Sequence, residues 1–533
     1  MKNIVGKLKK MLPYLAAAAV FILLAVVYCY PVLSGKVLKQ GDIYQWKGMA
    51  QETIQYYEQT GKWSAWTNSM FSGMPTYQIA GGGSYEVTWY TKICSALSVF
   101  FAKLTHLFFS NNVLMLIIGY FVGFYILLSS FKVDKWLSIV GSIAITLSSY
   151  FFIIIVAGHE SKALTLGLLA PVIAGFYLIF RKKYLWGVCL TMLYTAFGLY
   201  KHPQMSYYIF MMIGVLAIAE IWQHIKEKRF KDMAIALSLF VFSVLIGAGT
   251  GYGKYKCNVD YVKETMRGGH SEIVREDAVA TSANESGLSF DYATQWSYGI
   301  GETFTLMIPN FKGGASASNI GTDSRFAEAL KSRGVDPQAV SYYSSMAPTY
   351  WGEQPFTAGP VYVGAIVCLL FVLGLCIVKG PYKWGLLIAT LFSVFLSWGH
   401  NFEWFSKLFF NYFPLYSKFR AVSSILVVAQ IAMPLLGFLA LREIFERRVD
   451  AGKLKRSLLI ALGTTGGISL FLALFGGLIF SFTSSGDAYM AAQFPAWFME
   501  ALIDQRAAMF RSDCFRSFAF ILLAAILIFL FAK

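Results

Sequence analysis

The residues of this 533-residue chain that could do chemistry occur as short polar clusters between long apolar runs. The stretch VAGHESKALT (156–165) places His159, Glu160 and Lys162 at the mouth of a run long enough to cross a bilayer. Ionisable groups at such depth are costly and are functional by default. A helix beginning there would point its first N–H groups outward, and Lys162 would add charge, so the cluster predicts an anion site.

A zinc site and a surface ion pair are the two alternatives to an anion site at this cluster. A zinc site of the HExxH type would need a second histidine where Ala163 stands, so that site is excluded. A surface ion pair between Glu160 and Lys162, with one residue capping the helix, is the structural alternative.

Asp42, in KQGDIYQW, is the side chain best suited to acid–base chemistry. It follows the first apolar run and precedes the aromatic residues Tyr44 and Trp46. A single carboxylate beside an amphipathic aromatic segment is suited to deprotonating a substrate hydroxyl. The alternative is that Asp42 is the N-cap of a helix over IYQWKGMAQETIQYYEQ, and the two roles are compatible.

Two more clusters carry basic groups. In KHPQMSYY, Lys201, His202 and Gln204 could reach a phosphate or a sugar, or could anchor a helix at the headgroup level. In SKFRA, Lys418 and Arg420 precede a helix that we expect to enter from the outer side. The positive-inside rule does not explain basic residues at the outer boundary of the membrane. Binding of a lipid phosphate would explain them.

The polar stretch 251–358 is rich in Gly, Trp, Tyr, Asn and Gln and carries Glu302 within GIGETF. Such a composition suits carbohydrate, through aromatic stacking and amide hydrogen bonds. The pattern has low specificity, because loops at a membrane surface are aromatic in any case.

The composition places these clusters in an all-α polytopic membrane protein. Hydrophobic residues make up 57% of the chain, charged residues 14%, and the mean hydropathy is +0.56. Globular chains carry about 25% charged residues. The formal charge of +16 lies largely in short loops beside apolar runs, where it sets orientation, so it does not indicate nucleic acid.

The lysines before residue 11 place the N-terminus in the cytoplasm, and the basic short loops then alternate with polar outer ones. The stretch 94–110, with Lys103 and His106, is expected to be an interfacial or short helix. We predict about twelve spans (11–13), at residues 12–33, 112–130, 136–156, 163–180, 184–199, 206–222, 233–250, 359–378, 383–398, 421–440, 457–482 and 517–532.

Three parts follow from this topology. Residues 1–250 form an N-terminal transmembrane module with a first outer loop at 34–92, residues 251–358 a large extracytoplasmic region, and residues 359–533 the C-terminal helices. The unusual polar clusters fall mostly on the outer side, whereas the cytoplasmic loops hold mostly basic residues of the kind that orientation alone demands. We therefore expect the outer loops to pack as a cap around a single extracytoplasmic site.

Seven motifs, in order along the chain, resemble the YfhO family of bacterial membrane proteins in its Bacteroidetes form. They are GDIYQW, WTNSMFSGMPTYQI, GHESKALTLGLLAP, KHPQMSYY, YATQWSYGIGETFTLMIPNFKGG, YWGEQPFTAGPVYVGA and SKFRA. The resemblance covers nearly the whole chain. Relatives usually continue with more helices and an outer C-terminal region, so the resemblance implies a truncated or naturally short form.

That family is similar to the GT-C glycosyltransferases, which carry a catalytic acid in the first outer loop and use polyprenyl-phosphate sugars. The resemblance makes Asp42 the general base. It gives Glu160 and Glu302 a role in acceptor binding or at a divalent metal. An Asp-x-Asp pair is absent after Gly41, which leaves metal dependence open. Binding of the donor phosphate is assigned to His159, Lys162, His202, Lys418 and Arg420.

The function expected is transfer of a sugar from a polyprenyl-phosphate donor to an extracytoplasmic glycan, lipid or protein acceptor, in the bacterial inner membrane. The partners are then membrane lipids, the lipid-linked donor and the acceptor. A transporter or flippase for lipid-linked saccharides is the alternative. Such a protein is expected to carry ionisable residues deep within its helices, whereas the polar clusters of this chain lie mostly at the outer helix ends. A non-catalytic membrane assembly partner is a third possibility.

Overall fold

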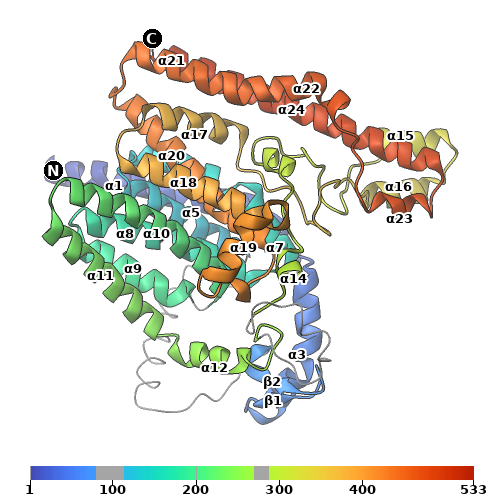
Figure 1. Cartoon of the computed structure of the whole chain (residues 1–533), viewed down its shortest axis with the longest axis horizontal. Helices are drawn as coiled ribbons and strands as arrows, with labels where there is room; N and C mark the ends of the chain where they lie inside the picture. The colour runs from blue at the N-terminus through green and yellow to red at the C-terminus, as the bar shows by residue number, and fades with distance from the viewer. Residues whose placement is uncertain (1, 80–112, 200, 269–286, 533) are drawn as a thin grey trace. The chain divides into compact units, whose positions relative to one another are not determined.

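The computed structural model describes residues 2–79, 113–199, 201–268 and 287–532 (Figure 1). Most of these residues are helical. The strands among them are β1 (Trp66–Thr67) and β2 (Met74–Pro75), which pair antiparallel. The prediction of an all-α polytopic membrane protein is confirmed.

Twelve apolar segments of the described residues correspond to the predicted spans. Two of them are pairs of helices bent at a short break: α6 (Lys135–Thr146) with α7 (Ser149–Ala157), bent by 45°, and α18 (Pro381–Ser397) with the segment Gly399–Tyr412 that contains α19 (Glu403–Tyr412), bent by 114°. The apolar stretch 94–110 lies outside the described residues. The eight unbroken segments that could cross a membrane are Met11–Tyr28, Val113–Ser130, Glu160–Phe180, Pro203–Lys226, Phe230–Gly249, Val422–Phe445, Ala451–Ile479 and Ala496–Ala532; Tyr184–Gly198 and Ala365–Ile377 are shorter.

The contacts divide the chain into two compact units built from interleaved segments. The first unit comprises Met1–Leu127, Ile154–Ser206 and Ala234–Glu264. Its segments supply α1 (Lys2–Tyr28), α2 (Tyr30–Leu33), α3 (Gly41–Thr60), η1 (Thr76–Gln78), most of α5 (Val113–Ser130), α8 (Glu160–Phe180), α9 (Tyr184–Gly198), most of α11 (Phe230–Gly249), and α12 (Tyr252–Val262).

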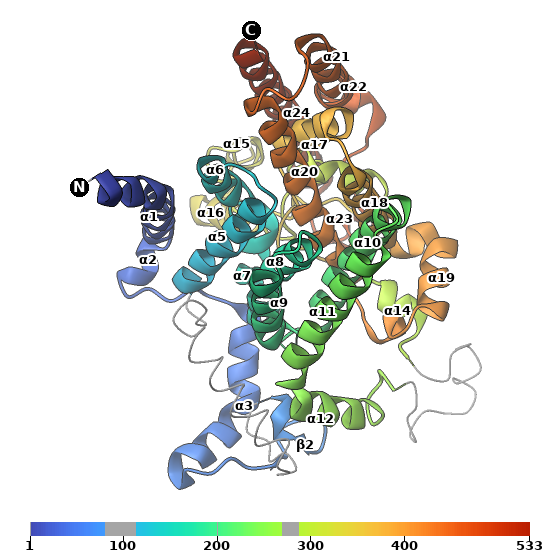
Figure 2. The same ribbon diagram turned by 90° about the vertical axis from the view of Figure 1, so that its left-hand side faces the viewer.

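Helix α8 is the core of the first unit, because every residue from Ala163 to Phe180 is buried. Helix α9 runs beside it (Figure 2). A Cβ added to Gly175 would lie 2.3 Å from Thr191 Oγ1, and one on Gly187 would lie 2.8 Å from the Gly175 carbonyl oxygen. The small residues at this crossing therefore allow the two backbones to pack closely, as is common between membrane helices.

The polar end of the first unit is also packed. The Tyr77 hydroxyl donates to the Cys257 carbonyl at 3.2 Å, and Gln78 Nε2 donates to Asn258 Oδ1 at 2.9 Å. These bonds join the loop after β2 to α12, which lies beside it in Figure 2. The described part of the first predicted outer loop, residues 34–79, is thus an ordered structure rather than a simple connector.

The second unit comprises Leu128–Ile153, Tyr207–Met233 and Thr265–Lys533. The topology predicts three parts that follow one another along the chain, whereas each of these units combines segments that are far apart in the sequence. The division into three parts stays a prediction. The helices of the second unit are α6 (Lys135–Thr146), most of α10 (Pro203–Lys226), α14 (Phe290–Thr294), η2 (Gly301–Leu306), α15 (Arg325–Ser332), α16 (Pro337–Ser345), α17 (Ala365–Ile377), α18 (Pro381–Ser397), η3 (Gly399–Phe402), α19 (Glu403–Tyr412), η4 (Tyr416–Lys418), η5 (Val422–Leu426), α20 (Val427–Phe445), α21 (Ala451–Ala461), the π-helical turn η6 (Leu462–Gly466), α22 (Gly467–Ile479), α23 (Asp487–Ala491) and α24 (Ala496–Ala532); α7 (Ser149–Ala157) is shared between the units.

Helix α24 is longer than a bilayer requires. Its 37 residues span about 55 Å at 1.5 Å per residue, whereas the hydrocarbon core is about 30 Å thick. Its first turns pack with α15 and α16 in a cluster that includes Phe326, Leu330, Phe498 and Leu502 (Figure 1). The N-terminal part of α24 therefore belongs to a water-facing subdomain, while its last turns are apolar enough for membrane.

Candidate functional site

Asp42 and His159 are in direct contact in the first unit. Asp42 Oδ2 lies 2.9 Å from His159 Nε2, and the two side chains are 53% and 46% exposed. A carboxylate held by an imidazole and still open to solvent can accept a proton from a bound hydroxyl. The structure therefore joins two residues that the sequence placed in separate clusters.

Asp42 occupies the first turn of α3 and is not its N-cap. The N-cap is Gln40, which makes no side-chain capping bond, so the predicted capping role of Asp42 is wrong. The Gln40 amide instead donates to the Ile155 carbonyl near the end of α7. This bond ties the start of α3 to the segment that carries His159.

Gly158 makes this close approach possible. Its φ is +90°, and an added Cβ would lie 3.2 Å from both Asp42 Cβ and Gln40 Cβ. An L-residue side chain would be strained there and would also crowd the site. The glycine of GHESK thus lets α7 end and α8 begin directly against the first turn of α3.

Helix α8 begins at Glu160, within the cluster where the sequence analysis expected a helix to begin, and His159 is its N-cap residue. The positive charge of Lys47, on α3, acts on the Glu160 carboxylate. Lys162 lies in the first turn of α8 and is half-buried. The first N–H groups of α8 are thus accompanied by two basic side chains, which favours an anion at this end of the helix.

The KHPQMSYY segment lies at the same end of the first unit. The Gly198 carbonyl accepts from Thr165 Oγ1 and from Ser206 Oγ, both at 3.3 Å, which joins the start of α8 to the start of α10. His202 Nδ1 accepts from the Met205 N–H at 3.3 Å, so this side chain caps α10. Gln204 follows it in the first turn of α10.

Lys254, on α12, is a basic residue of the first unit that sequence reasoning missed. Burial, together with the charge of Lys201, lowers its pKa. Two lysines that repel one another suit a bound anion. The signal was present in the sequence YGKYK, directly after the span ending at residue 250.

The second unit contains its own basic cluster, formed by Arg267, Lys418 and Arg420. Lys418 Nζ donates to the Arg267 carbonyl at 2.8 Å, and the Arg267 guanidinium donates back to the Lys418 carbonyl. Arg420 donates to the Tyr292 hydroxyl, and its guanidinium lies 5.5 Å and 5.7 Å from the ring centroids of Tyr292 and Trp296.

The cations of this basic cluster repel one another. Burial, and then the charge of Arg420, lowers the pKa of Arg267, and burial lowers the pKa of Lys418. Cations beside aromatic faces can hold a phosphate and stack a sugar ring. Arg267 was missed by the sequence analysis because it stands apart from SKFRA in the chain.

Glu302 is almost fully buried in the second unit, at 3% exposure. Its carboxylate accepts from the Tyr350 hydroxyl at 2.9 Å, from Gln354 Nε2 at 3.1 Å and from the Gly299 N–H at 3.2 Å. Burial outweighs these donors and raises its pKa. The adjoining cavity, about 10 Å³, has room for roughly one water. Glu302 thus holds two loops together, and its role in acceptor binding stays a prediction.

Helix α10 carries a buried ionisable pair that the sequence analysis passed over. Glu220 and His224 are 0% and 2% exposed, and Glu220 Oε2 lies 3.5 Å from His224 Nδ1. The pair lies in the last two turns of α10, which ends at Lys226. The spacing of four residues on an apolar helix is the signal that could have revealed it.

The donor set for a metal ion was tested on the same residues. Within residues 2–79, 113–199, 201–268 and 287–532, no group of three or more His, Cys, Asp or Glu side chains is placed to hold one. A divalent ion held entirely by protein ligands does not fit these residues, so no step below passes through one.

Comparison of the chain with protein-family models, with curated proteins and with solved structures gave no match.

Proposed function

We propose that this protein is a membrane glycosyltransferase that moves a sugar from a polyprenyl-phosphate donor to a hydroxyl of an acceptor on the outer side of the bacterial inner membrane. The observation that carries the proposal is the contact between Asp42 and His159, 2.9 Å apart and open to solvent. It supplies a positioned base at the polar end of a multi-helix unit. The resemblance to the YfhO family points to the same aspartate.

The proposed reaction is a direct displacement. Asp42 takes the proton of the acceptor hydroxyl, the acceptor oxygen forms a bond to the anomeric carbon, and the bond from that carbon to the donor phosphate oxygen breaks. The electron pair of the broken bond leaves with the phosphate. His159 orients the Asp42 carboxylate that takes this proton. One displacement inverts the configuration of the anomeric carbon.

The departing phosphate gains negative charge, so basic groups lower the barrier if they are nearer to it in the transition state than before. In the first unit, the basic groups proposed to stabilise this charge are Lys162, Lys201 and Lys254, together with the imidazole of His202. In the second unit, the basic cluster of Arg267, Lys418 and Arg420 has the chemistry of a phosphate site.

Transport of a lipid-linked saccharide is the second candidate, and one observation favours it. Glu220 and His224 form a buried ionisable pair within an apolar helix, as proton-coupled carriers use. The clustering of the other polar groups at the helix ends argues for transfer instead.

The deciding experiment uses the full chain reconstituted in vesicles with a panel of radiolabelled polyprenyl-phosphate sugars and a membrane extract as acceptor. Transferase activity moves the label from the donor into a new, carrier-free product. A transporter leaves the label on intact donor and carries it across the bilayer. Donor translocation without any product would overturn the proposal in favour of transport.

A further inference from the structure

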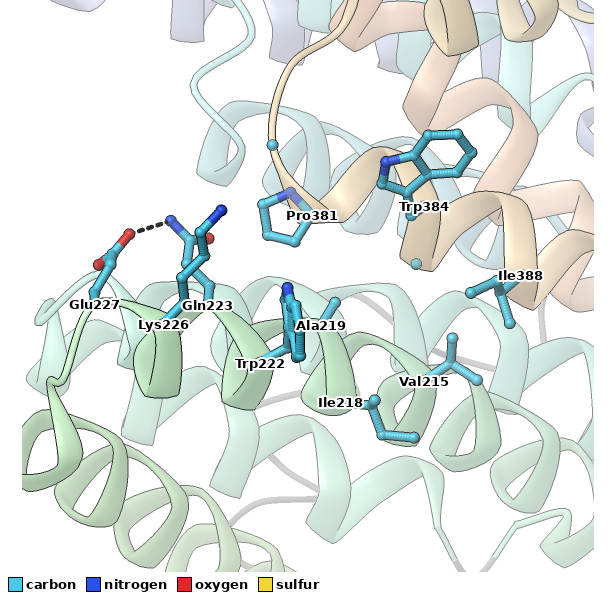
Figure 3. A pocket seen from close by; sticks show the side chains of 12 residues that line it. Val215, Ile218, Ala219, Trp222, Gln223, Lys226, Glu227, Pro381, Trp384 and Ile388 are labelled. Atoms are coloured by element: carbon cyan, nitrogen blue, oxygen red, sulfur yellow. Dashed lines mark hydrogen bonds between the residues drawn. The ribbon is translucent and has the colours of Figure 1, made fainter.

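A groove of about 840 Å³ lies between α10 and α18, entirely within the second unit (Figure 3). It does not involve any residue of the site proposed above. Small residues form its floor: Ala219 lines it, and a Cβ on Gly385 would lie 3.0 Å from Leu216 Cδ2. The two helices are therefore close at the floor, and the absence of large side chains there leaves the groove open.

The walls of the groove are apolar and exposed. Ile218 and Trp222 of α10 are 69% and 66% exposed, and Trp384 and Ile388 of α18 are 56% and 53% exposed. Both helices belong to segments apolar enough to span a membrane. Side chains of this kind at such a position face lipid, and tryptophans mark the level of the headgroups.

One end of the groove is basic. Helix α10 ends and α18 begins there, in two loops that the charge pattern places on the cytoplasmic side. Arg229 pairs with Glu227 at 3.0 Å and with Asp232 at 3.1 Å, and the first loop, KEKRFKD (226–232), keeps a net formal charge of +2 from four basic and two acidic residues. Lys383 Nζ lies 4.8 Å from the Trp384 ring. Within the described part of the chain, no ion pair is formed by Lys226, Lys228, Lys231, Lys379 or Lys383.

We infer that this groove binds one anionic phospholipid of the cytoplasmic leaflet. Its acyl chain lies on Ala219 between the two tryptophans, and its phosphate meets Lys226 and Lys383. The volume falls within the range of specific small-molecule sites. Charge complementarity selects the occupant: the cytoplasmic leaflet is anionic, and each lysine near its surface adds attraction. A neutral partner helix would gain nothing from the five lysines.

Native mass spectrometry of the purified full chain in detergent tests this inference. The probes are dioleoyl phosphatidylglycerol, dioleoyl phosphatidylcholine and a polyprenyl phosphate, added singly and in competition. Ala219→Leu fills the floor of the groove, and Lys226→Gln with Lys383→Gln removes charge at its end. Lys182→Gln with Lys183→Gln is the matched control, because it removes two lysines from another basic loop.

The expected result is a one-to-one complex with phosphatidylglycerol that phosphatidylcholine does not displace. Ala219→Leu and the Lys226/Lys383 pair each weaken it by about tenfold, and the Lys182/Lys183 pair leaves it unchanged. Three outcomes would overturn the inference. The protein could bind phosphatidylglycerol and phosphatidylcholine equally well, the Lys182/Lys183 control pair could weaken phosphatidylglycerol binding as much as the Lys226/Lys383 pair, or the polyprenyl phosphate could displace phosphatidylglycerol. A dimer dissociated by Ala219→Leu would assign the groove to a second copy instead.

Discussion

Asp42 and His159 could each be singled out from the sequence, but their contact could not. Residue type and the position after an apolar run sufficed to select them. The contact depends on Gly158 at φ +90° and on the Gln40 amide bonding to Ile155. Neither feature has a local sequence signature. Side-chain chemistry was therefore predictable at this site, whereas tertiary pairing was not.

Lys418 gives a pH-dependent prediction. Burial lowers its pKa, so its charge is lost at a lower pH than the ordinary lysine value of about 10.4. An ammonium that binds the donor phosphate contributes while it is charged, and its contribution falls as the pH rises through the lowered pKa. We expect the dissociation constant of the donor to rise at alkaline pH, beginning below the pH at which an ordinary lysine loses its charge.

Lys418→Arg should remove that alkaline rise, because a guanidinium stays charged over this range. Titration of labelled donor at several pH values measures it. Lys407→Arg, at an exposed lysine paired with Glu403, is the control and should keep the wild-type profile. If the dissociation constant of the donor rises at alkaline pH equally in Lys418→Arg and in wild type, Lys418 does not bind the donor phosphate.

At the scale of elements, a buried ion pair joins α23 to α24. Arg506 is 1% exposed and bonds both oxygens of Asp487, at 2.7 and 2.9 Å, and also the Phe482 and Pro348 carbonyls. Burial alone would raise the pKa of Asp487, but the Arg506 guanidinium and the Ser484 donors outweigh it, so the pKa lies below its usual value. The stability from this carboxylate is present above about pH 4 and is lost as the pH falls through the lowered pKa.

Asp487→Ala leaves the Arg506 guanidinium buried without its carboxylate. We expect the free energy of unfolding, measured by denaturant in detergent at pH 7, to fall by about 3–5 kcal/mol. Asp504→Ala is the control, because Asp504 forms an exposed pair with Arg325 at 3.5 Å, and its loss should stay below about 1 kcal/mol. Equal losses in the two variants would contradict the account.

The elements themselves were largely predictable, because length and hydropathy alone identify a span. Their irregularities were not. The break between α6 and α7 contains no proline, so the sequence of the span 136–156 gave no signal that predicts a bend. Helix α24 begins at Ala496, well before the predicted residue 517. Its first part is polar enough to resemble a loop, although the spacing of Phe498 and Leu502 is that of one helix face.

On the scale of the whole molecule, the two units are each made of segments far apart in the chain. Asp42, His159 and His202 belong to the first, and Lys418 and Arg420 to the second. A prediction made along the chain divides it into consecutive parts, since topology follows sequence order. The gathering of all the polar clusters into one outer site stays a prediction.

Orientation in the membrane can be checked by labelling single cysteines in a cysteine-free background. Trp63, in the first outer loop, is 41% exposed, and Lys183 is exposed in the basic loop before α9. The positive-inside pattern predicts that a membrane-impermeant maleimide labels Trp63→Cys in intact cells and Lys183→Cys only after permeabilisation. Labelling of Lys183→Cys in intact cells would reverse the topology and move Asp42 to the cytoplasm.

The most direct measurement compares sugar transfer and donor binding in Asp42→Asn and wild type. The amide cannot accept the acceptor proton, so turnover should fall by about 10²–10⁴-fold while donor affinity changes by less than about threefold. Asp260→Asn, at an exposed acid 3.1 Å from Lys256, should retain wild-type turnover. Wild-type turnover in Asp42→Asn would contradict the proposed chemistry.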